Sequence, residues 1–267
     1  MKKYYWFLLA APAVFFISCT NNDTSSSNSG ATPEHTTPSM SFSIASTLPH
    51  DTSFFTEGLE FYNNTLLEST GLPGKSRLVQ TDPATGKVLQ MVHLDPKYFG
   101  EGITVLHDTI FQLTWQEHVV HVYTAKDFKK IKELPLNGEG WGLTNDGKNL
   151  IASDGSSNLY YYDPSSFKLV RTLSVTENGS MVLNINELEY VNGFIYANQW
   201  QYNYILKINP TTGEVVAKLD LTDQVNKVHA TDPHAEYLNG LAYNPNTKKF
   251  YVTGKLWSEL YELQFDR

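Results

Sequence analysis

The stretch YFGEGI, residues 98–103, belongs to a phrase that returns four more times along the chain. The other copies are FFTEGL (54–59), GEGWGL (138–143), NINELE (184–189) and YLNGLA (237–242). One position of the phrase changes from copy to copy at spacings of 44, 40, 45 and 53 residues, and holds Glu57, Glu101, Trp141, Asn186 and Asn239. Periods in the forties with strands in every unit are typical of the blades of a β-propeller.

Further apolar runs follow each copy of the phrase and predict four strands per blade. The second runs include TIFQLTW (109–115) and FIYANQW (194–200), and the third include HVVHVYT (118–124) and ELYELQF (259–265). Turns built from Asp-Pro, Asn-Pro and Gly, such as DPATGK (82–87), separate the third run from a fourth. The sequence therefore predicts an all-β fold, a five-bladed β-propeller with four-stranded blades.

The two ends of the repeat array predict how the ring closes. An early strand, SFSIAST (41–47), precedes the first copy, whereas the last copy lacks an outer strand of its own. We expect the early strand to complete the last blade, because closure removes an exposed sheet edge. Two insertions are longer than ordinary blade turns, at 176–184 and 220–239, and the second includes a predicted short helix before the last blade.

The repeated phrase is predicted to form the innermost strand of each blade, where glycines let backbones crowd near the axis. Equivalent positions then lie on one ring, so the five variable residues of the phrase face a common pocket at the channel mouth. The ends of the following strands bring Trp115, Asp154, Trp200 and Lys255 to the same face. Packing and a structural salt bridge are the alternative roles for any one of these residues taken singly.

Composition and motifs argue against several classes of function. The 267 residues carry a net charge of −8 without a block of Lys or Arg, so we expect no binding of nucleic acid. There is no pair of cysteines and no His-Glu-x-x-His motif, so catalytic zinc is not expected and no metal ligands are assigned. A structural cation held by channel carboxylates is compatible with the sequence. The sequence contains no G-x-S-x-G motif, which is the pattern that would indicate a nucleophilic serine.

The N-terminus resembles a bacterial lipoprotein signal. Lys2 and Lys3 precede an apolar stretch at 4–17, and Ser18 precedes the only cysteine, Cys19, which would carry the lipid. Cleaved secretion and a membrane-anchored start are the alternatives, although the apolar stretch is shorter than the roughly 20 residues that span a bilayer.

These features divide the chain into three parts. Residues 1–19 are interpreted as the signal that ends in the lipidated cysteine, residues 20–40 as a flexible tether rich in Ser, Thr and Asn, and residues 41–267 as the propeller domain. The division predicts an exported protein, anchored to a membrane by its N-terminal lipid and facing the periplasm or the cell exterior.

Seven motifs occur in order between about Phe54 and Phe265: FGEGIT, LTW, GWGLTNDG, SDGS, NELEYVNGFIYANQW, LNGLAY and VTGKLW. In this order they resemble the plant and bacterial type of glutaminyl-peptide cyclotransferase, or glutaminyl cyclase. The resemblance implies a five-bladed propeller that converts the N-terminal glutamine of a peptide or protein to pyroglutamate and releases ammonia. It also implies an acid/base mechanism that requires no cofactor or metal ion.

The resemblance implies roles for individual residues. Glu101, in FGEGIT, is the implied general acid and base, and Lys255, in TGKLW, would orient this acid or support the tetrahedral oxyanion. Asn186, in NELEY, would hydrogen-bond the substrate. The indoles that would surround the glutamine side chain are those of Trp115, Trp141 and Trp200.

Glu57 departs from the family pattern, because plant members tend to carry Gln at this position. It would bind the α-amine of the substrate or act as a fixed structural charge. Two other functions stay open: a surface-anchored propeller that binds a ligand without catalysis, and a calcium-dependent propeller lactonase. The presence of both Glu101 and Lys255 favours an enzyme, and the Trp-rich lining favours an amide pocket over a calcium site.

Overall fold

The structure is a computed structural model in which residues 36–265 are described. The predicted signal at 1–19 with Cys19, and the tether up to residue 35, lie outside the described residues. In the described part of the chain, no helix combines the length and the apolar character needed to cross a membrane.

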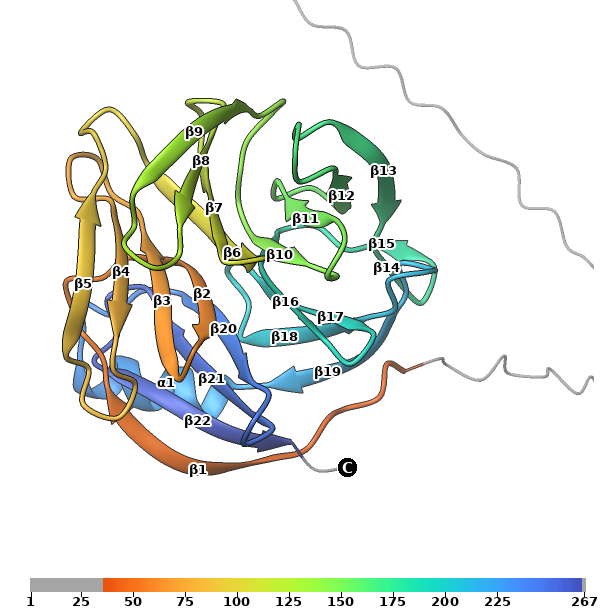
Figure 1. The fold of residues 1–267 in the computed structure, drawn as a ribbon. Coiled ribbons are helices and arrows are strands. Elements are labelled where there is room, and N and C mark those ends of the chain that lie inside the picture. The colour runs from red at the N-terminus through yellow and green to blue at the C-terminus, as the bar shows by residue number, and fades with distance from the viewer. Residues whose placement is uncertain (1–35, 266–267) are drawn as a thin grey trace, which may run out of the picture. The chain divides into compact units, whose positions relative to one another are not determined.

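Five four-stranded antiparallel sheets surround a central axis (Figure 1). The first three blades consist of β2 (Thr56–Tyr62), β3 (Thr65–Thr70), β4 (Arg77–Thr81) and β5 (Val88–His93); β6 (Gly100–Leu106), β7 (Thr109–Thr114), β8 (Val119–Thr124) and β9 (Lys130–Pro135); and β10 (Leu143–Asn145), β11 (Leu150–Ser153), β12 (Asn158–Tyr162) and β13 (Leu169–Ser174). The last two consist of β16 (Ile185–Val191), β17 (Phe194–Gln199), β18 (Tyr204–Ile208) and β19 (Val215–Asp220); and β20 (Leu238–Asn244), β21 (Lys249–Gly254), β22 (Glu259–Phe265) and β1 (Phe42–Pro49). The predicted five-bladed propeller is thus confirmed.

Strand β1 closes the ring as the sequence predicts, and it ends two residues beyond the predicted strand. It runs antiparallel to β22, from Phe42 opposite Phe265 to Pro49 opposite Glu259, and so covers what would otherwise be an exposed sheet edge (Figure 1). The next residue, His50, bonds the carbonyl oxygen of Trp257 at 2.7 Å through Nδ1. The end of the closing strand is thereby fixed to the last blade.

The core consists of apolar clusters between neighbouring blades. Leu67 from the first blade packs with Ile103 and Ile110 from the second, and all three are fully buried. Ile151 from the third blade similarly packs with Leu188 from the fourth. Because successive side chains of a strand point to opposite faces, each strand of a blade contributes residues to the clusters on both of its sides.

Glycines allow the innermost strands to approach one another. A Cβ atom on Gly142 would lie 2.0 Å from the carbonyl oxygen of Asn186, which is shorter than any real contact. The fourth blade carries Glu187 at the equivalent position of the phrase. Its side chain is fully buried, and its Oε1 accepts the N–H of Leu59 from the first blade at 3.3 Å. Glu187 therefore fills space beside the axis that the other blades leave to glycine.

Both predicted insertions form local structure of their own. The first contains a short hairpin, β14 (Thr176–Glu177) and β15 (Ser180–Met181), and the second contains helix α1 (Thr222–Thr231), as predicted. Val225 and Val228 of α1 are buried against the last blade. Both insertions lead into an innermost strand, so they emerge on the face of the ring where the innermost strands begin.

Candidate active site

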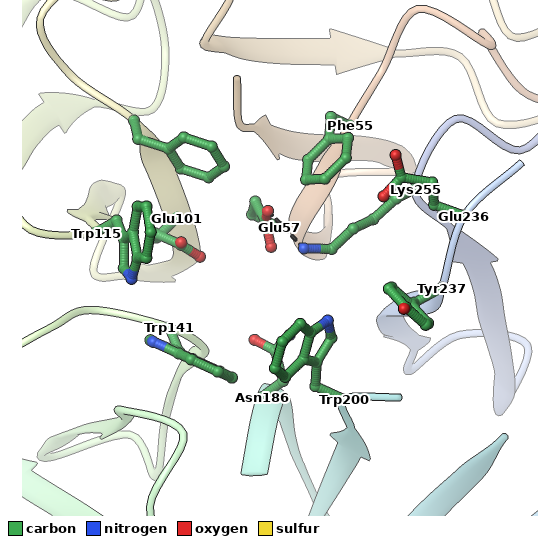
Figure 2. A pocket seen from close by; sticks show the side chains of 11 residues that line it. Phe55, Glu57, Glu101, Trp115, Trp141, Asn186, Trp200, Glu236, Tyr237 and Lys255 are labelled. Carbon is green, nitrogen blue, oxygen red and sulfur yellow. Dashed lines mark hydrogen bonds and ion pairs between the residues drawn. The ribbon is translucent and has the colours of Figure 1, made fainter. Parts of the chain in front are cut away.

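A pocket of about 310 Å³ lies at this face, around the starts of the innermost strands (Figure 2). It is lined by Phe55, Glu57, Phe99, Glu101, Trp115, Trp141, Asn186, Trp200, Glu236, Tyr237 and Lys255. All seven residues that the sequence assigned to catalysis or substrate binding are among them. The structure therefore brings together side chains from all five blades, and the most distant two, Phe55 and Lys255, are 200 positions apart in the sequence.

Irregular pairing at the start of the innermost strands directs these side chains. The pairing register shifts between Thr56 and Gly58, and again between Gly100 and Ile103 and between Ile185 and Leu188. Glu57, Glu101 and Asn186 lie within these shifts. A β-bulge bends the strand and re-aims a side chain, so the side chains within these shifts depart from the regular alternation of the strand. The last blade has a similar shift between Leu238 and Leu241.

The third blade positions its pocket residue, Trp141, in a different way. Its inner strand β10 begins at Leu143, so Trp141 precedes the strand and is not part of it, contrary to the prediction for the whole phrase. Backbone hydrogen bonds still fix the segment, because Trp141 N donates to Ser153 O at 3.1 Å and Ser153 N donates to Gly142 O at 3.0 Å.

One prediction about the mouth is wrong. Asn239 is fully buried behind Glu57 and does not line the pocket. The backbone at Gly240 has a φ of +115°, a conformation that Gly58, Gly102 and Gly142 do not adopt, which accounts for the different path of this strand. Asp154, which was expected at the same face and not in the pocket itself, follows the end of β11, and its neighbour Gly155 lies against the ring of Trp141. Its carboxylate accepts hydrogen bonds from Tyr160 Oη and Ser156 N.

A buried ion pair lies at the centre of the pocket. Lys255 Nζ is 2.6 Å from Glu57 Oε1, and the two side chains are 8% and 2% exposed (Figure 2). Asn239 Nδ2 donates to the other carboxylate oxygen of Glu57 at 3.3 Å. Lys255 also lies over the ring of Phe55, 4.5 Å from its centroid. Among the described contacts, the ammonium group bonds Glu57 and has no direct hydrogen bond to Glu101.

Glu101 is the second buried acid of the pocket. Burial and the negative charge of Glu57 raise the pKa of Glu101 well above its usual value, and the positive charge of Lys255 opposes this shift. Burial also raises the pKa of Glu57, but the charge of Lys255 and a hydrogen bond with Glu101 act to lower it. Because Glu57 has the cation in direct contact, Glu57 is the acid of this pair that ionises first as the pH rises, and Glu101 keeps its proton to a higher pH.

Asn186 presents an unused hydrogen-bond acceptor. Its Oδ1 is buried and has no partner in the described protein, although the side chain lines the pocket. Its backbone is fixed separately, because Ser153 Oγ donates to Asn186 O at 2.8 Å. A buried acceptor without a partner costs about 1–3 kcal/mol, which a donor on a bound ligand would recover.

Four lining residues were missed by the sequence analysis: Phe55, Phe99, Glu236 and Tyr237. Three of them share a signal that was available. Phe55, Phe99 and Tyr237 each stand two residues before a variable position of the phrase. Glu236 carries no such signal and is held by its backbone, which donates to Lys255 O at 2.8 Å and accepts from Trp257 Nε1 at 2.8 Å.

Metal-binding side chains are not clustered in the described structure. Within residues 36–265, no group of three or more His, Cys, Asp or Glu side chains is arranged to hold a metal ion. The structural cation suggested by the channel carboxylates therefore stays a prediction.

Comparisons with known proteins give the family of the chain. The family model described as glutamine cyclotransferase matches residues 13–265. A glutaminyl-peptide cyclotransferase of Arabidopsis thaliana is 38% identical over 225 residues, which are 83% of this chain and 70% of the relative. The crystal structure of Myxococcus xanthus glutaminyl cyclase matches with a TM-score of 0.81 and 34% identity, covering 86% of this chain and 99% of that one. The chain therefore belongs to the glutamine cyclotransferase family.

Proposed function

We propose that this protein converts the N-terminal glutamine of peptides or proteins to pyroglutamate, with Glu101 as general acid and base. The observation that carries the mechanism is that Glu101 is a buried carboxyl with a raised pKa inside an aromatic pocket. Beside it lies a second acid, Glu57, whose negative charge is balanced by the ammonium of Lys255. Family membership supports the reaction itself.

The pocket offers complementary partners for each part of a glutamine residue. The indoles of Trp141 and Trp200 meet edge to face at 5.5 Å and give an apolar wall for the side-chain methylenes. The free Oδ1 of Asn186 accepts a hydrogen bond from an N–H group of the substrate. The ionised carboxylate of Glu57 attracts the α-amine, which places the nucleophile beside Glu101.

The reaction needs one proton to move between two nitrogens. The α-amine attacks the side-chain amide carbon, a C–N bond forms, and the amide oxygen becomes an oxyanion while the attacking nitrogen becomes positively charged. Glu101 in its carboxylate form takes a proton from this nitrogen and then donates it to the departing amide nitrogen. The oxyanion collapses, the original C–N bond breaks, and ammonia leaves. A raised pKa brings Glu101 closer to the amine in proton affinity, which favours both transfers.

Lys255 supplies positive charge to the same centre. Its ammonium group has three N–H donors, and one of them is used by Glu57 at 2.6 Å. A remaining donor reaches the oxyanion of the tetrahedral intermediate in this proposal. Glu57 then serves as the fixed partner that holds Lys255 in place within a pocket where an unpaired ammonium would be costly.

Replacing the acid tests the mechanism directly. The purified chain is incubated with short peptides that begin with Gln, and ammonia release and peptide mass are followed together. Glu101→Gln is expected to lower kcat by at least about 100-fold, because general acid–base catalysis contributes about that much or more. A variant that melts like the wild type and keeps its rate would contradict the role of Glu101.

Two parallel samples separate the other candidate functions. A chelator added to the wild type is expected to leave the rate unchanged, whereas a calcium-dependent lactonase would lose its activity. A well-folded wild type that releases no ammonia from any Gln peptide would favour a ligand-binding propeller.

We also propose that the protein is exported and anchored to a membrane through a lipid on Cys19, facing the periplasm or the cell exterior. Support comes from Lys2 and Lys3, the apolar stretch at 4–17 and the polar tether that follows the cysteine. In cells that process lipoproteins, Cys19→Ala is expected to move the protein from the membrane fraction to the soluble fraction. Membrane association that survives the substitution would refute anchoring by lipid.

A further inference from the structure

The aromatic wall of the pocket consists of two separate arcs. In the first arc, the ring centroids of Phe55 and Phe99 are 6.2 Å apart, and those of Phe99 and Trp115 are 5.7 Å apart. The second arc comprises Trp141, Trp200 and Tyr237, with successive centroid distances of 5.5 and 5.9 Å. Every contact within an arc is edge to face, which is a favourable arrangement for aromatic pairs. No ring contact joins Trp115 to Trp141 in the described structure.

Glu139 bridges the gap between the arcs. Its Oε2 accepts hydrogen bonds from Trp115 Nε1 at 2.9 Å and from Trp141 Nε1 at 3.1 Å. Its Oε1 accepts from Gln116 Nε2 at 2.8 Å. Trp115 and Gln116 follow β7 of the second blade, whereas Trp141 precedes β10 of the third, so one carboxylate connects two blades.

The local backbone fixes this carboxylate over the second blade. Gly140, the next residue, donates its N–H to Trp115 O at 3.1 Å. A Cβ atom on Gly140 would lie 2.6 Å from the carbonyl oxygen of Thr114, so glycine alone permits this close approach. The neighbouring backbone and the three hydrogen bonds of its side chain therefore both fix the position of Glu139.

The bridge is charged at neutral pH. Partial burial acts to raise the pKa of Glu139, but hydrogen bonds from Gln116, Trp141 and Trp115 outweigh it, and the pKa lies below its usual value. Hydrogen bonds to an ionised acceptor are stronger than those between neutral groups. An ionised Glu139 therefore holds both indoles more firmly than a neutral acceptor would.

We propose that Glu139 is a positioning residue that joins the two arcs and so sets the width of the slot for the substrate glutamine. This inference rests on the proposed function, because it assigns the indoles to substrate binding. Glu139 contacts no reacting atom in this scheme and acts only through Trp115 and Trp141. Its loss therefore weakens substrate binding more than it slows the chemical step.

A rival explanation is that Glu139 acts on Glu101 only by its charge. Glu117 and Glu139 both raise the pKa of Glu101, with the larger effect from Glu117. The carboxylate of Glu117 accepts the N–H of Phe99 at 3.3 Å and has no hydrogen bond to an indole. Glu117→Gln therefore removes a comparable charge without touching the bridge, and it is the matched control for Glu139.

Steady-state kinetics with a Gln peptide test the bridge. Glu139→Ala is expected to raise KM about tenfold with kcat within about twofold of the wild type, which is the pattern of lost uniform binding. Glu139→Gln, which keeps a carbonyl acceptor for an indole, is expected to rescue part of the loss. Glu117→Gln is expected to keep the wild-type KM while moving the acidic limb of the pH profile to lower pH. Equal KM values for Glu139→Ala and Glu117→Gln would overturn the proposal.

A measurement without substrate keeps the two proposals distinguishable. Fluorescence quenching by acrylamide is expected to increase in Glu139→Ala, because Trp115 and Trp141 lose their common anchor, and to stay unchanged in Glu117→Gln. Unchanged quenching in Glu139→Ala would refute the bridge even if all variants cyclise peptides. If the wild type cyclises no peptide, the proposed function fails while quenching still decides the bridge. If Glu139→Ala does not melt cooperatively, Glu139→Gln carries both tests.

Discussion

At the scale of single residues, the pocket separates the roles of two acids by giving them different neighbours. Glu57 and Glu101 are both buried in the same pocket, at 2% and 6% exposure. Of the two acids, Lys255 bonds only Glu57, which compensates the burial of that charge. Glu101 lacks such a partner, and this is why its pKa is raised by burial and by its charged neighbour.

Removing the charge of Glu57 should change the pH profile of the reaction. In Glu57→Gln, Glu101 loses a nearby negative charge, and the ammonium of Lys255 loses its partner. Both changes favour the carboxylate form, so the pKa of Glu101 falls and the acidic limb of kcat/KM moves to lower pH. The check is kcat/KM from about pH 4 to 9, with Glu236→Gln as a control for a pocket acid that does not contact Lys255 Nζ. A limb that stays in place or moves to higher pH would contradict this account.

At the scale of secondary-structure elements, the innermost strands combine irregular pairing with very close packing. The irregular starts direct Glu57, Glu101 and Asn186 into the mouth, and the glycines that follow the variable positions leave room for the neighbouring blade. Gly142 is the tightest of these sites, with the backbone of β16 beside it. Asn186 can therefore occupy its position only because Gly142 has no side chain.

Gly142→Ala should destabilise the propeller and disturb the site together. The added Cβ would meet Asn186 O at 2.0 Å, and overpacking of this kind costs about 3 kcal/mol or more. Gly74→Ala is the control, because Gly74 has a φ of +71° but no atom within 4 Å of the added Cβ. Its expected cost is only the backbone strain of about 1–2 kcal/mol. Thermal or urea unfolding measures both, and equal losses would show that the contact at Gly142 is relieved by relaxation.

At the scale of the whole molecule, the innermost strands around the axis carry buried carboxyl groups whose pKa values are raised by burial. Burial raises the pKa of Glu187 and of Glu189 well above the usual value. Burial also raises the pKa of Glu60 to about 8, and the charge of Glu60, once it ionises, adds to the other two shifts. Glu187 Oε2 is buried without a hydrogen-bond partner in the described protein. The ring therefore closes around groups that are stable when neutral and costly when ionised.

The contribution of these carboxyl groups to stability should consequently fall as the pH rises. The pKa of each of these carboxyls is higher in the folded protein than in the unfolded chain, where it is about 4.3. Their contribution to stability is therefore complete below about pH 4.3 and is lost as the pH rises from there to the folded pKa. Over that range of pH, each carboxyl with a raised pKa lowers the free energy of unfolding by about 1.4 kcal/mol per pH unit. Glu187→Gln keeps the shape of the protonated acid and is expected to flatten the decline in Tm above about pH 5. Glu133→Gln, at an exposed acid with a lowered pKa, should leave that decline intact. An unchanged slope in Glu187→Gln would show that this group is already ionised in the folded protein.

The sequence by itself determined the architecture and most of the pocket. A repeat fixes both, because equivalent positions in successive blades occupy equivalent places around one axis, and this placed Glu101, Asn186 and Lys255 at one mouth. Phe55 and Phe99 also occupy a repeating position of the phrase, two residues before the variable one, so the same argument places them at this mouth.

The tertiary structure alone decided which of these residues act on one another. It pairs Lys255 with Glu57, turns Asn239 behind the pocket, and joins two blades through Glu139. The physical reason is that a period specifies where a backbone passes, whereas the direction of a side chain depends on local φ and ψ and on neighbours supplied by distant segments. The proton affinity of Glu101 is also decided at this level, because burial and the spacing of charges exist only once the ring has closed.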